Sequence, residues 1–329
     1  MGKIVVEEDH FLKILSVILD PETPETHKQA VQRFFAHDVP DFLTWCEDFR
    51  PRLPALYPCS VDYARDRNDF LQKVEEAGAA VVESLRVDEE VLRRAPKLRV
   101  IQKFGWITSN IDEKACRASG VAIERLRRVG NIAVAEQAFA FILVLAKRIC
   151  AFDHVVEERS LRERGYEVRP RSPYIGYSNP AGITGLRTLY GSKLGIVGFG
   201  EIGREIALYG AAFGMEIGYF QRTRLSAEEE EQYGAKYEPL DDLVACSDYL
   251  VVQLPLNDST RGLINGRLLR RTKKGLFLIN VARAELVDRD ALIGALRSGS
   301  LGGWASTSAT PNQPCPTIRC SSSTTATSF

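Results

Sequence analysis

The residues with the most evident chemistry form a glycine-rich motif in the second half of the chain. Gly198-Phe199-Gly200-Glu201-Ile202-Gly203 directly follows an apolar strand predicted at Leu194–Val197 and opens a predicted helix. In this context, GxGxxG is typical of a dinucleotide fold. The first glycine permits the tight turn, the second lets the backbone reach the pyrophosphate, and the third lets helix and strand pack closely. The alternative, a glycine-rich turn that binds nothing, is disfavoured because the helix N-terminus also attracts phosphate.

The residues after the next predicted strand indicate which dinucleotide is bound. An NAD site places an acidic residue about 20 residues beyond the motif, where it accepts a hydrogen bond from the ribose 2′-hydroxyl. Here the strand at Glu216–Phe220 is followed by Gln221, Arg222, Thr223 and Arg224, with no carboxylate. Two guanidinium groups and a hydroxyl suit a 2′-phosphate. The sequence therefore favours NADP over NAD, the alternative being that both arginines are solvated loop charges.

The elements that position these residues alternate between strands and helices, which predicts βαβ units, a parallel sheet and the α/β class. The remaining strands are predicted at 79–82, 98–101, 121–123, 249–252 and 276–279. The helices are predicted at 88–95, 110–119, 201–213, 240–246, 267–271 and 288–298. A longer helix over residues 134–148 is apolar almost all round, so we expect it to be buried between layers or domains.

Two segments lie outside this alternation. In the first fifty residues, helical spacing occurs around Phe11–Leu19 and His27–Phe35, interrupted by prolines at 21, 24 and 40, which predicts an N-terminal helical extension. A loop with prolines at 170, 173 and 180 follows the long apolar helix.

Length and composition bound the class of protein. A chain of 329 residues suits two domains. The 43 basic and 43 acidic residues balance, which argues against a nucleic-acid or anionic-membrane partner recruited by bulk charge. Seven scattered cysteines indicate reduced thiols, neither a disulfide framework nor a metal site. The longest apolar run, Ala138–Ala146, is short for a membrane span, and Glu7 to Asp9 stand where a signal peptide would be apolar. We therefore expect a cytoplasmic protein.

With the motifs aligned, residues 56–304 resemble the D-isomer-specific 2-hydroxyacid dehydrogenases, among them the glyoxylate/hydroxypyruvate reductases and phosphoglycerate dehydrogenases. Besides the glycine motif, the matching segments are Pro96–Gly105, Asn110-Ile111-Asp112, Val134-Ala135-Glu136, Leu254-Pro255-Leu256, Thr260–Asn265, Asn280-Val281-Ala282-Arg283 and Leu286-Val287-Asp288. The resemblance implies two Rossmann-like doubly wound parallel-sheet domains with the active site in the cleft between them. Residues 1–130 would form a flavodoxin-like substrate domain and residues 131–304 the NAD(P) domain.

The resemblance also implies the reaction, which is reversible hydride transfer between nicotinamide and a 2-hydroxy or 2-keto acid, in a homodimer. Arg283 corresponds to the family's catalytic arginine, whose planar guanidinium can hold the carboxylate and polarise the carbonyl. Besides the glycine motif and the segment 221–224, the cofactor-binding residues implied are Leu254, Pro255, Thr260, Val281, Ala282 and Arg283.

The segment Lys103, Gly105, Trp106 and Ile107 matches the loop whose backbone amides bind the substrate carboxylate in this family. The family usually has a small or compact residue followed by glycine at the positions of Trp106 and Ile107. This departure leaves the size of the substrate open.

The family uses a glutamate and a histidine beyond the arginine for proton transfer. The four histidines of this chain, at positions 10, 27, 37 and 154, all precede Arg283, and we interpret them as surface or hydrogen-bonded side chains. The chain as it stands therefore predicts impaired catalysis. The alternative is a catalytically inactive, dinucleotide-regulated binding protein, as in the C-terminal-binding corepressors of this family.

The family pattern runs through Leu301–Trp304 and then stops. Residues 305–329 hold six serines, six threonines and three prolines with a single charged residue, a composition that predicts disorder. If each codon from residue 305 ends in G or C, shifting the frame back by one base turns Ser306-Thr307-Ser308 into Leu-Asp-Val and places the family's glutamate at Asn312. We therefore predict an out-of-frame, truncated C-terminus, the alternative being a genuine Ser/Thr-rich tail.

Overall fold

The computed structural model describes residues 2–152, 157–166, 168, 174, 182–308, 317–320 and 327–328. The chain divides into two compact units, unit 1 (Met1–Arg128) and unit 2 (Val129–Phe329), so the boundary lies two residues before the one expected at 130. The three prolines of the expected loop, at positions 170, 173 and 180, fall outside the described residues. Both units are α/β with parallel sheets, which confirms the predicted fold class.

Unit 1 is built on a five-stranded parallel sheet of order β2-β1-β3-β4-β5, which is the flavodoxin-like order. Its strands are β1 (Gly2–Glu7), β2 (Cys59–Ala64), β3 (Ala79–Val82), β4 (Val100–Lys103) and β5 (Ala122–Arg125). Its helices are α1 (Ile14–Leu19), α2 (Glu25–Phe35), α3 (Phe42–Phe49), α4 (Arg67–Lys73), α5 (Glu89–Arg94) and α6 (Glu113–Ala118).

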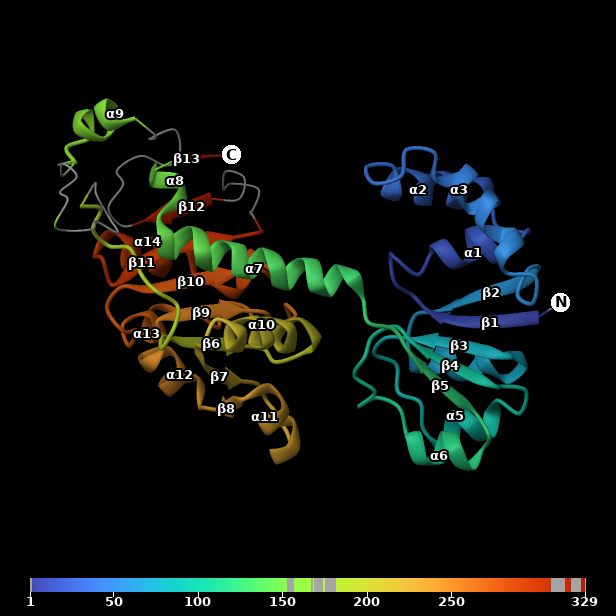
Figure 1. Ribbon diagram of the computed structural model, residues 1–329. Helices are drawn as coiled ribbons and strands as arrows, with labels where there is room; N and C mark the ends of the chain where they lie inside the picture. Colours follow the sequence, from blue (N-terminus) through green and yellow to red (C-terminus); the bar gives the residue numbers. More distant parts are fainter. Residues whose placement is uncertain are drawn as a thin grey trace. The chain divides into compact units, whose positions relative to one another are not determined.

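Helices cover both faces of this sheet, as Figure 1 shows. Successive strand residues point to opposite faces. Ile4 and Val6 accordingly pack with α1, α2 and α3, whereas Val5 packs with α4, α5 and α6. Both faces of β1 are therefore buried, which explains its continuous apolar run.

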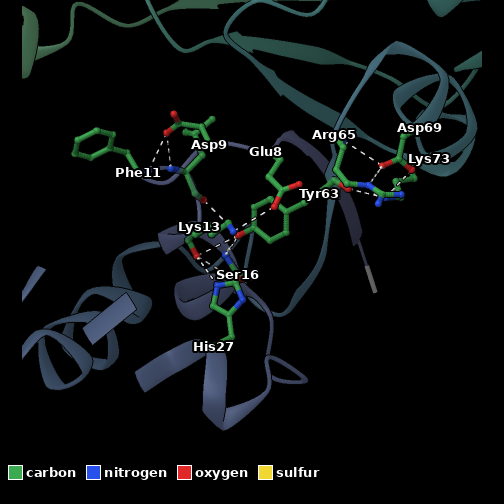
Figure 2. Close-up of polar contacts among 11 residues, drawn as sticks. Glu8, Asp9, Phe11, Lys13, Ser16, His27, Tyr63, Arg65, Asp69 and Lys73 are labelled. Atoms are coloured by element: carbon green, nitrogen blue, oxygen red, sulfur yellow. Dashed lines mark hydrogen bonds and ion pairs between the residues drawn. The ribbon is translucent and has the colours of Figure 1, made fainter. Parts of the chain in front are cut away.

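The N-terminal segment contains helices α1 and α2 where helical spacing was expected, but its first residues form a strand, which the sequence analysis did not predict. β1 pairs with β2 and β3, inside the sheet. Its apolar run, Ile4-Val5-Val6, is too short to reveal a strand by periodicity. The helical segments after it are tied to β2 through Tyr63, whose hydroxyl donates to Lys13 O at 3.1 Å and accepts from Ser16 N–H at 3.2 Å (Figure 2). His27 Nε2 lies 3.3 Å from Ser16 Oγ, so this histidine is hydrogen-bonded.

Unit 2 contains a sheet of order β13-β12-β11-β10-β9-β6-β7-β8, in which β11 to β8 are parallel. The strands are β6 (Lys193–Val197), β7 (Glu216–Phe220), β8 (Ala235–Tyr237), β9 (Tyr249–Val252), β10 (Leu276–Asn280), β11 (Leu301–Ser306), β12 (Thr317–Cys320) and β13 (Thr327–Ser328). The order changes direction at β6, so the carboxyl end of β6 is the topological switch point where such sheets bind ligands.

Helices also cover both faces of this sheet. They are α7 (Val129–Lys147), α8 (Ile149–Phe152), α9 (Glu158–Glu163), α10 (Glu201–Ala212), α11 (Ala227–Tyr233), α12 (Leu240–Cys246), α13 (Gly266–Leu269) and α14 (Arg289–Arg297). α7 and α10 share one apolar core with the sheet, and α12, α13 and α14 share the other. Among the described residues, α7 is the one helix long and apolar enough to cross a membrane, yet its residues pack against α10, β10 and β11, as in a core helix.

Of the C-terminal residues that the structure describes, 305–308, 317–320 and 327–328, most lie in strands, where the composition predicts disorder. β11 continues to Ser306, and Ala305 and Ser306 pair with Ile279 and Asn280 of β10. Thr307 N–H donates to Asn280 O at 3.1 Å. Strands β12 and β13 add to the sheet in antiparallel fashion. Backbone pairing with an existing strand needs no large apolar side chain, which is why composition alone missed this order.

Candidate functional site

The glycine motif forms a tight turn at the carboxyl end of β6, as the sequence predicts. Gly198 has φ +102°, and a Cβ there would lie 1.9 Å from Gln253 O. A Cβ on Gly203 would lie 2.3 Å from Gly198 O, so helix α10 could not pack so closely with a larger residue. In contrast, a Cβ on Gly200 would meet no atom within 4 Å. The open space before Gly200, at the N-terminus of α10, is what a pyrophosphate requires.

A cavity of about 520 Å³ opens at this turn, within the range of small-molecule and cofactor sites. It brings together nine of the predicted cofactor residues: Gly198, Phe199, Gly200, Gln221, Arg222, Thr223, Leu254, Pro255 and Thr260. Their elements are far apart in sequence, but each lies where a parallel strand ends. Because the carboxyl ends of parallel strands meet at one edge of the sheet, the topology brings these residues together around the cavity.

The other predicted cofactor residues do not line this cavity. Glu201 Oε2 accepts a hydrogen bond of 2.7 Å from Asn131 Nδ2 of α7, and Ile202 packs against the core beside α7. Val281 and Ala282 are buried, and Arg283 is exposed. A role for these residues in cofactor binding stays a prediction.

The two arginines of the loop after β7 differ in their contacts. Arg224 forms two hydrogen bonds with the Glu230 carboxylate, 2.9 Å from Nε and 2.8 Å from Nη2. This guanidinium and the Tyr219 hydroxyl lower the pKa of Glu230 to about 2. Arg222 instead lines the cavity, and it forms no ion pair with any other residue that the structure describes. The cavity lining contains this cation and no acidic side chain.

Sequence reasoning missed five residues of the lining, which are Phe220, Gln253, Asn257, Ser259 and Leu263. Gln253 is the most informative, because its buried Oε1 has no hydrogen-bond partner among the described residues. A buried unsatisfied acceptor of this kind fits a ligand that carries a donor. Its position just after β9, at the same sheet edge as the glycine motif, is the signal that could have identified it. The cavity as a whole fits a dinucleotide.

Arg283 directly follows the turn that ends β10, and Asn280 holds this turn. The buried Asn280 side chain accepts from Ala282 N–H at 3.0 Å and donates to Arg283 O at 2.8 Å. Ser308 Oγ donates to Ala282 O. These bonds fix the backbone on both sides of Arg283, while the Arg283 side chain is exposed. A fixed backbone with an exposed guanidinium suits the recognition of a carboxylate or carbonyl oxygen.

The predicted substrate loop lies in unit 1, at the carboxyl end of β4. Lys103 is buried, and its Nζ donates to Glu83 O. Gly105 has φ +150°, a conformation that favours glycine. Trp106 is 53% exposed, and the Arg125 guanidinium lies 5.9 Å from its ring centre. Lys103 is thus anchored to the neighbouring loop, and of the residues that follow it Gly105 is buried, Ile107 is half-buried and Trp106 is exposed.

A neighbouring carboxylate, which sequence reasoning did not single out, organises the loop that Lys103 contacts. Glu7 at the end of β1 accepts backbone N–H groups of Glu83, Ser84 and Leu85 at 2.6, 2.8 and 2.9 Å. Burial alone would raise the pKa of Glu7, but these hydrogen bonds hold it below the usual range. Glu7 therefore orders the backbone next to the candidate substrate loop.

Comparison with known proteins identifies the family of this chain. Residues 139–318 match the model of the D-isomer specific 2-hydroxyacid dehydrogenase family, in its NAD binding domain. The fold and cavity define a nucleotide-binding domain of the Rossmann type. The chain belongs to the D-isomer specific 2-hydroxyacid dehydrogenase family, and its matched domain is one that binds a nicotinamide dinucleotide.

Three relatives illustrate the similarity. Glyoxylate reductase of Pyrococcus horikoshii is 36% identical over 238 residues, which cover 72% of this chain and 68% of that protein. D-3-phosphoglycerate dehydrogenase of Mycobacterium bovis is 35% identical over 235 residues, 71% of this chain and 41% of that protein. A Pyrococcus horikoshii protein of known crystal structure shares the fold, with a TM-score of 0.52 at 22% identity over 94% of this chain and 78% of that one.

Proposed function

We propose that this protein is an NADP-preferring oxidoreductase that interconverts a 2-hydroxy acid and a 2-keto acid. The observation that carries the proposal is the cavity at the carboxyl end of β6, which joins the glycine motif to Arg222 with no acidic side chain in its lining. A 2′-phosphate suits a cation at this position, whereas a free 2′-hydroxyl suits an acid. The similarity to glyoxylate reductases supports a small 2-keto acid as substrate.

The chain's own residues supply binding and charge stabilisation. A bound nicotinamide dinucleotide supplies or accepts the hydride. Arg283, set by the turn that Asn280 holds, would bind the carboxylate and carbonyl oxygens of the substrate and stabilise negative charge as it develops on the carbonyl oxygen. Backbone N–H groups of the loop at Gly105, Trp106 and Ile107 would bind the substrate carboxylate.

A panel of 2-keto acids tests this function, with NADPH and NADH offered separately to the purified chain. We expect turnover of glyoxylate or hydroxypyruvate, faster at low cofactor concentration with NADPH. Arg283→Ala should lower kcat/KM by at least about a hundredfold, since removing one charge-stabilising donor costs about 10²–10³-fold. Turnover that is indifferent to Arg283 would contradict the proposed role.

We also propose that the rate of this chain is limited by proton transfer, because no histidine follows Arg283 in the sequence. A positioned acid–base group contributes about 10²–10⁴-fold, so the 329-residue chain should be at least about a hundredfold slower than a relative that has one. Turnover by the 329-residue chain as fast as that of such a relative would show that another group supplies the proton.

The out-of-frame origin of residues 305 onward is part of the same proposal. Its support is the composition of residues 305–329, which hold six serines, six threonines and a single charged residue. Sequencing the gene decides the matter, because an intact frame with no family-like reading one base back would exclude it. Restoring the frame should restore the glutamate and a Pro-His segment to the sequence. It should also raise the turnover rate by about a hundredfold.

The missing histidine favours a second candidate function, a dinucleotide-regulated binding protein without turnover. Cofactor binding with no detectable reduction of any 2-keto acid, even in a frame-restored chain, would favour it. For either function we propose a cytoplasmic homodimer by resemblance to the family, which sedimentation of the purified chain and cell fractionation would test.

A further inference from the structure

A second cavity, of about 540 Å³, lies at the opposite edge of the sheet of unit 2 from the glycine motif. Its floor is formed where β10 and β11 begin, by Gly275, Phe277 and Gly302, and one wall is the end of α7. The glycine motif, by contrast, follows the carboxyl end of β6. No residue lines both cavities, so this one is separate from the proposed cofactor site.

The lining of this second cavity carries one sign of charge. Three of its ten residues are the cations Arg148, Arg187 and Lys274, and none is acidic. The Arg187 guanidinium and the Lys274 ammonium form no hydrogen bond or ion pair with any other residue that the structure describes. Like charges gathered in a concave site repel one another and raise the local potential, so an anion that binds there relieves the repulsion. We call this site the basic cavity.

Arg187 is held in place by contacts that leave its N–H groups available. Its guanidinium lies 4.3 Å from the centre of the Phe277 ring, and its backbone N–H donates to Ala146 O at 2.9 Å. Gly275, with φ +80°, makes room for it, since a Cβ there would lie 2.7 Å from Arg187 Nη2. A guanidinium fixed by its face presents its edge, which is the geometry that binds phosphate or carboxylate oxygens in pairs.

Arg148 adds a second fixed cation. Its backbone has φ +52°, and it is the one non-glycine residue with positive φ that the structure records in the described part of the chain. Such a conformation costs about 1–3 kcal/mol for most residues and persists only where the surroundings impose it. Nη1 of Arg148 donates to Thr184 O at 2.9 Å, which directs this side chain toward the loop that forms the opposite wall.

Asp248 interacts electrostatically with Arg187, but the carboxylate of Asp248 already binds two other groups. Asp248 accepts Lys193 N–H at 2.9 Å and pairs with Lys273 Nζ at 2.5 Å. Burial would raise the pKa of Asp248, but these hydrogen bonds keep it below the usual range. Asp248 is not part of the cavity lining, although the charge of Arg187 also helps to lower its pKa.

We propose that the basic cavity is a binding site for a small polyanion that carries phosphate or carboxylate groups. The volume accepts a molecule larger than a single phosphate. Arg187 and Lys274 would contact its oxygens directly, with Arg148 on the facing wall. This site goes beyond the proposed oxidoreductase activity and does not depend on it.

Calorimetric titration of the 329-residue chain with inorganic pyrophosphate and with citrate tests the proposal at low ionic strength. The variants are Arg187→Ala and Lys274→Gln, the latter at an exposed position that leaves the fold unchanged. Arg289→Ala is the matched control, because it removes one charge at the far end of α14. Arg222→Ala reports binding in the proposed cofactor cavity instead.

We expect each cavity variant to weaken binding of at least one probe by about tenfold or more, as for loss of a hydrogen bond to a charged group. Arg289→Ala and Arg222→Ala should leave this binding within about twofold. Pyrophosphate binding without citrate binding would specify phosphate, and the reverse would specify carboxylate. The proposal is overturned if neither probe binds, if Arg222→Ala alone weakens binding, or if Lys274→Gln and Arg187→Ala both bind like the wild type.

Discussion

Replacing Arg222 with alanine should weaken NADPH binding much more than NADH binding. Arg222 is the one cation in the lining of the proposed cofactor cavity, and it stands two residues after the strand that ends at Phe220. NADPH and NADH differ by the 2′-phosphate alone. A loss of affinity for NADPH without a loss of affinity for NADH therefore indicates that the 2′-phosphate contacts Arg222.

The expected rise in the Kd for NADPH follows from the charge and the exposure of the Arg222 side chain. A hydrogen bond to a charged group contributes about 1.5–3 kcal/mol. Arg222 is exposed, so water competes for the phosphate and the contribution falls to about 1–2 kcal/mol. This corresponds to about a 5- to 30-fold rise in the Kd for NADPH. Arg224 already contacts Glu230 at 2.8 Å, so Arg224→Ala should change the same Kd by less than about threefold.

Fluorescence titration of the wild type and both variants with each reduced cofactor measures the four relevant ratios. Arg224→Ala serves as the matched control because it removes the same charge from the same loop. Equal losses for NADPH and NADH in Arg222→Ala would refute the phosphate contact. A larger loss in Arg224→Ala would show that Glu230 releases its partner when the cofactor binds.

Three further changes test the supporting structure. Gly198→Ala should abolish dinucleotide binding and lower the free energy of unfolding by about 2–4 kcal/mol, since the new methyl group would collide with Gln253 O, and cofactor titration with urea unfolding checks both effects. Glu7→Ala should cost about 1–3 kcal/mol by leaving buried N–H groups unpaired. Because the pKa of Glu7 is lowered, its contribution is complete above the ordinary carboxyl pKa and is lost as the pH falls through the lowered value, so unfolding curves of Glu7→Ala and wild type should converge in acid. Asn280→Ala should lower kcat with little change in cofactor affinity, because it loosens the turn before Arg283 without touching the cofactor cavity, and steady-state kinetics separates the two.

Four parallel strands of unit 2, β6, β7, β9 and β10, could be predicted closely because each is a short and largely buried apolar run, whereas β8, which exposes Lys236, was not predicted. The strands predicted at 216–220 and 249–252 have the same bounds as β7 and β9. The glycine motif was equally predictable, since its spacing reflects close backbone approaches at Gly198 and Gly203. In the apolar strands and in the glycine motif, the residue types that the tertiary structure requires are also the ones that form a recognisable local pattern.

Other features depend on contacts between distant residues, which local patterns do not contain. β1 lies inside its sheet, between β2 and β3, yet its three apolar residues are too few to identify a strand by periodicity. The anchoring of Lys103 at Glu83 O and the pairing of Arg224 with Glu230 were not predictable, because both partners are ordinary surface residue types. β11 extends past Trp304 through backbone hydrogen bonds, which composition does not report.

Single-turnover reduction of hydroxypyruvate is the most direct test of the proposed function. The 329-residue chain, in excess over NADPH, is mixed with saturating hydroxypyruvate, and NADP and glycerate are quantified over time with Arg283→Ala in parallel. The proposal predicts equal amounts of NADP and D-glycerate, formed slowly by the wild type and at least about a hundredfold more slowly by Arg283→Ala. Bound NADPH that stays unoxidised, or equal rates for the two proteins, would contradict it.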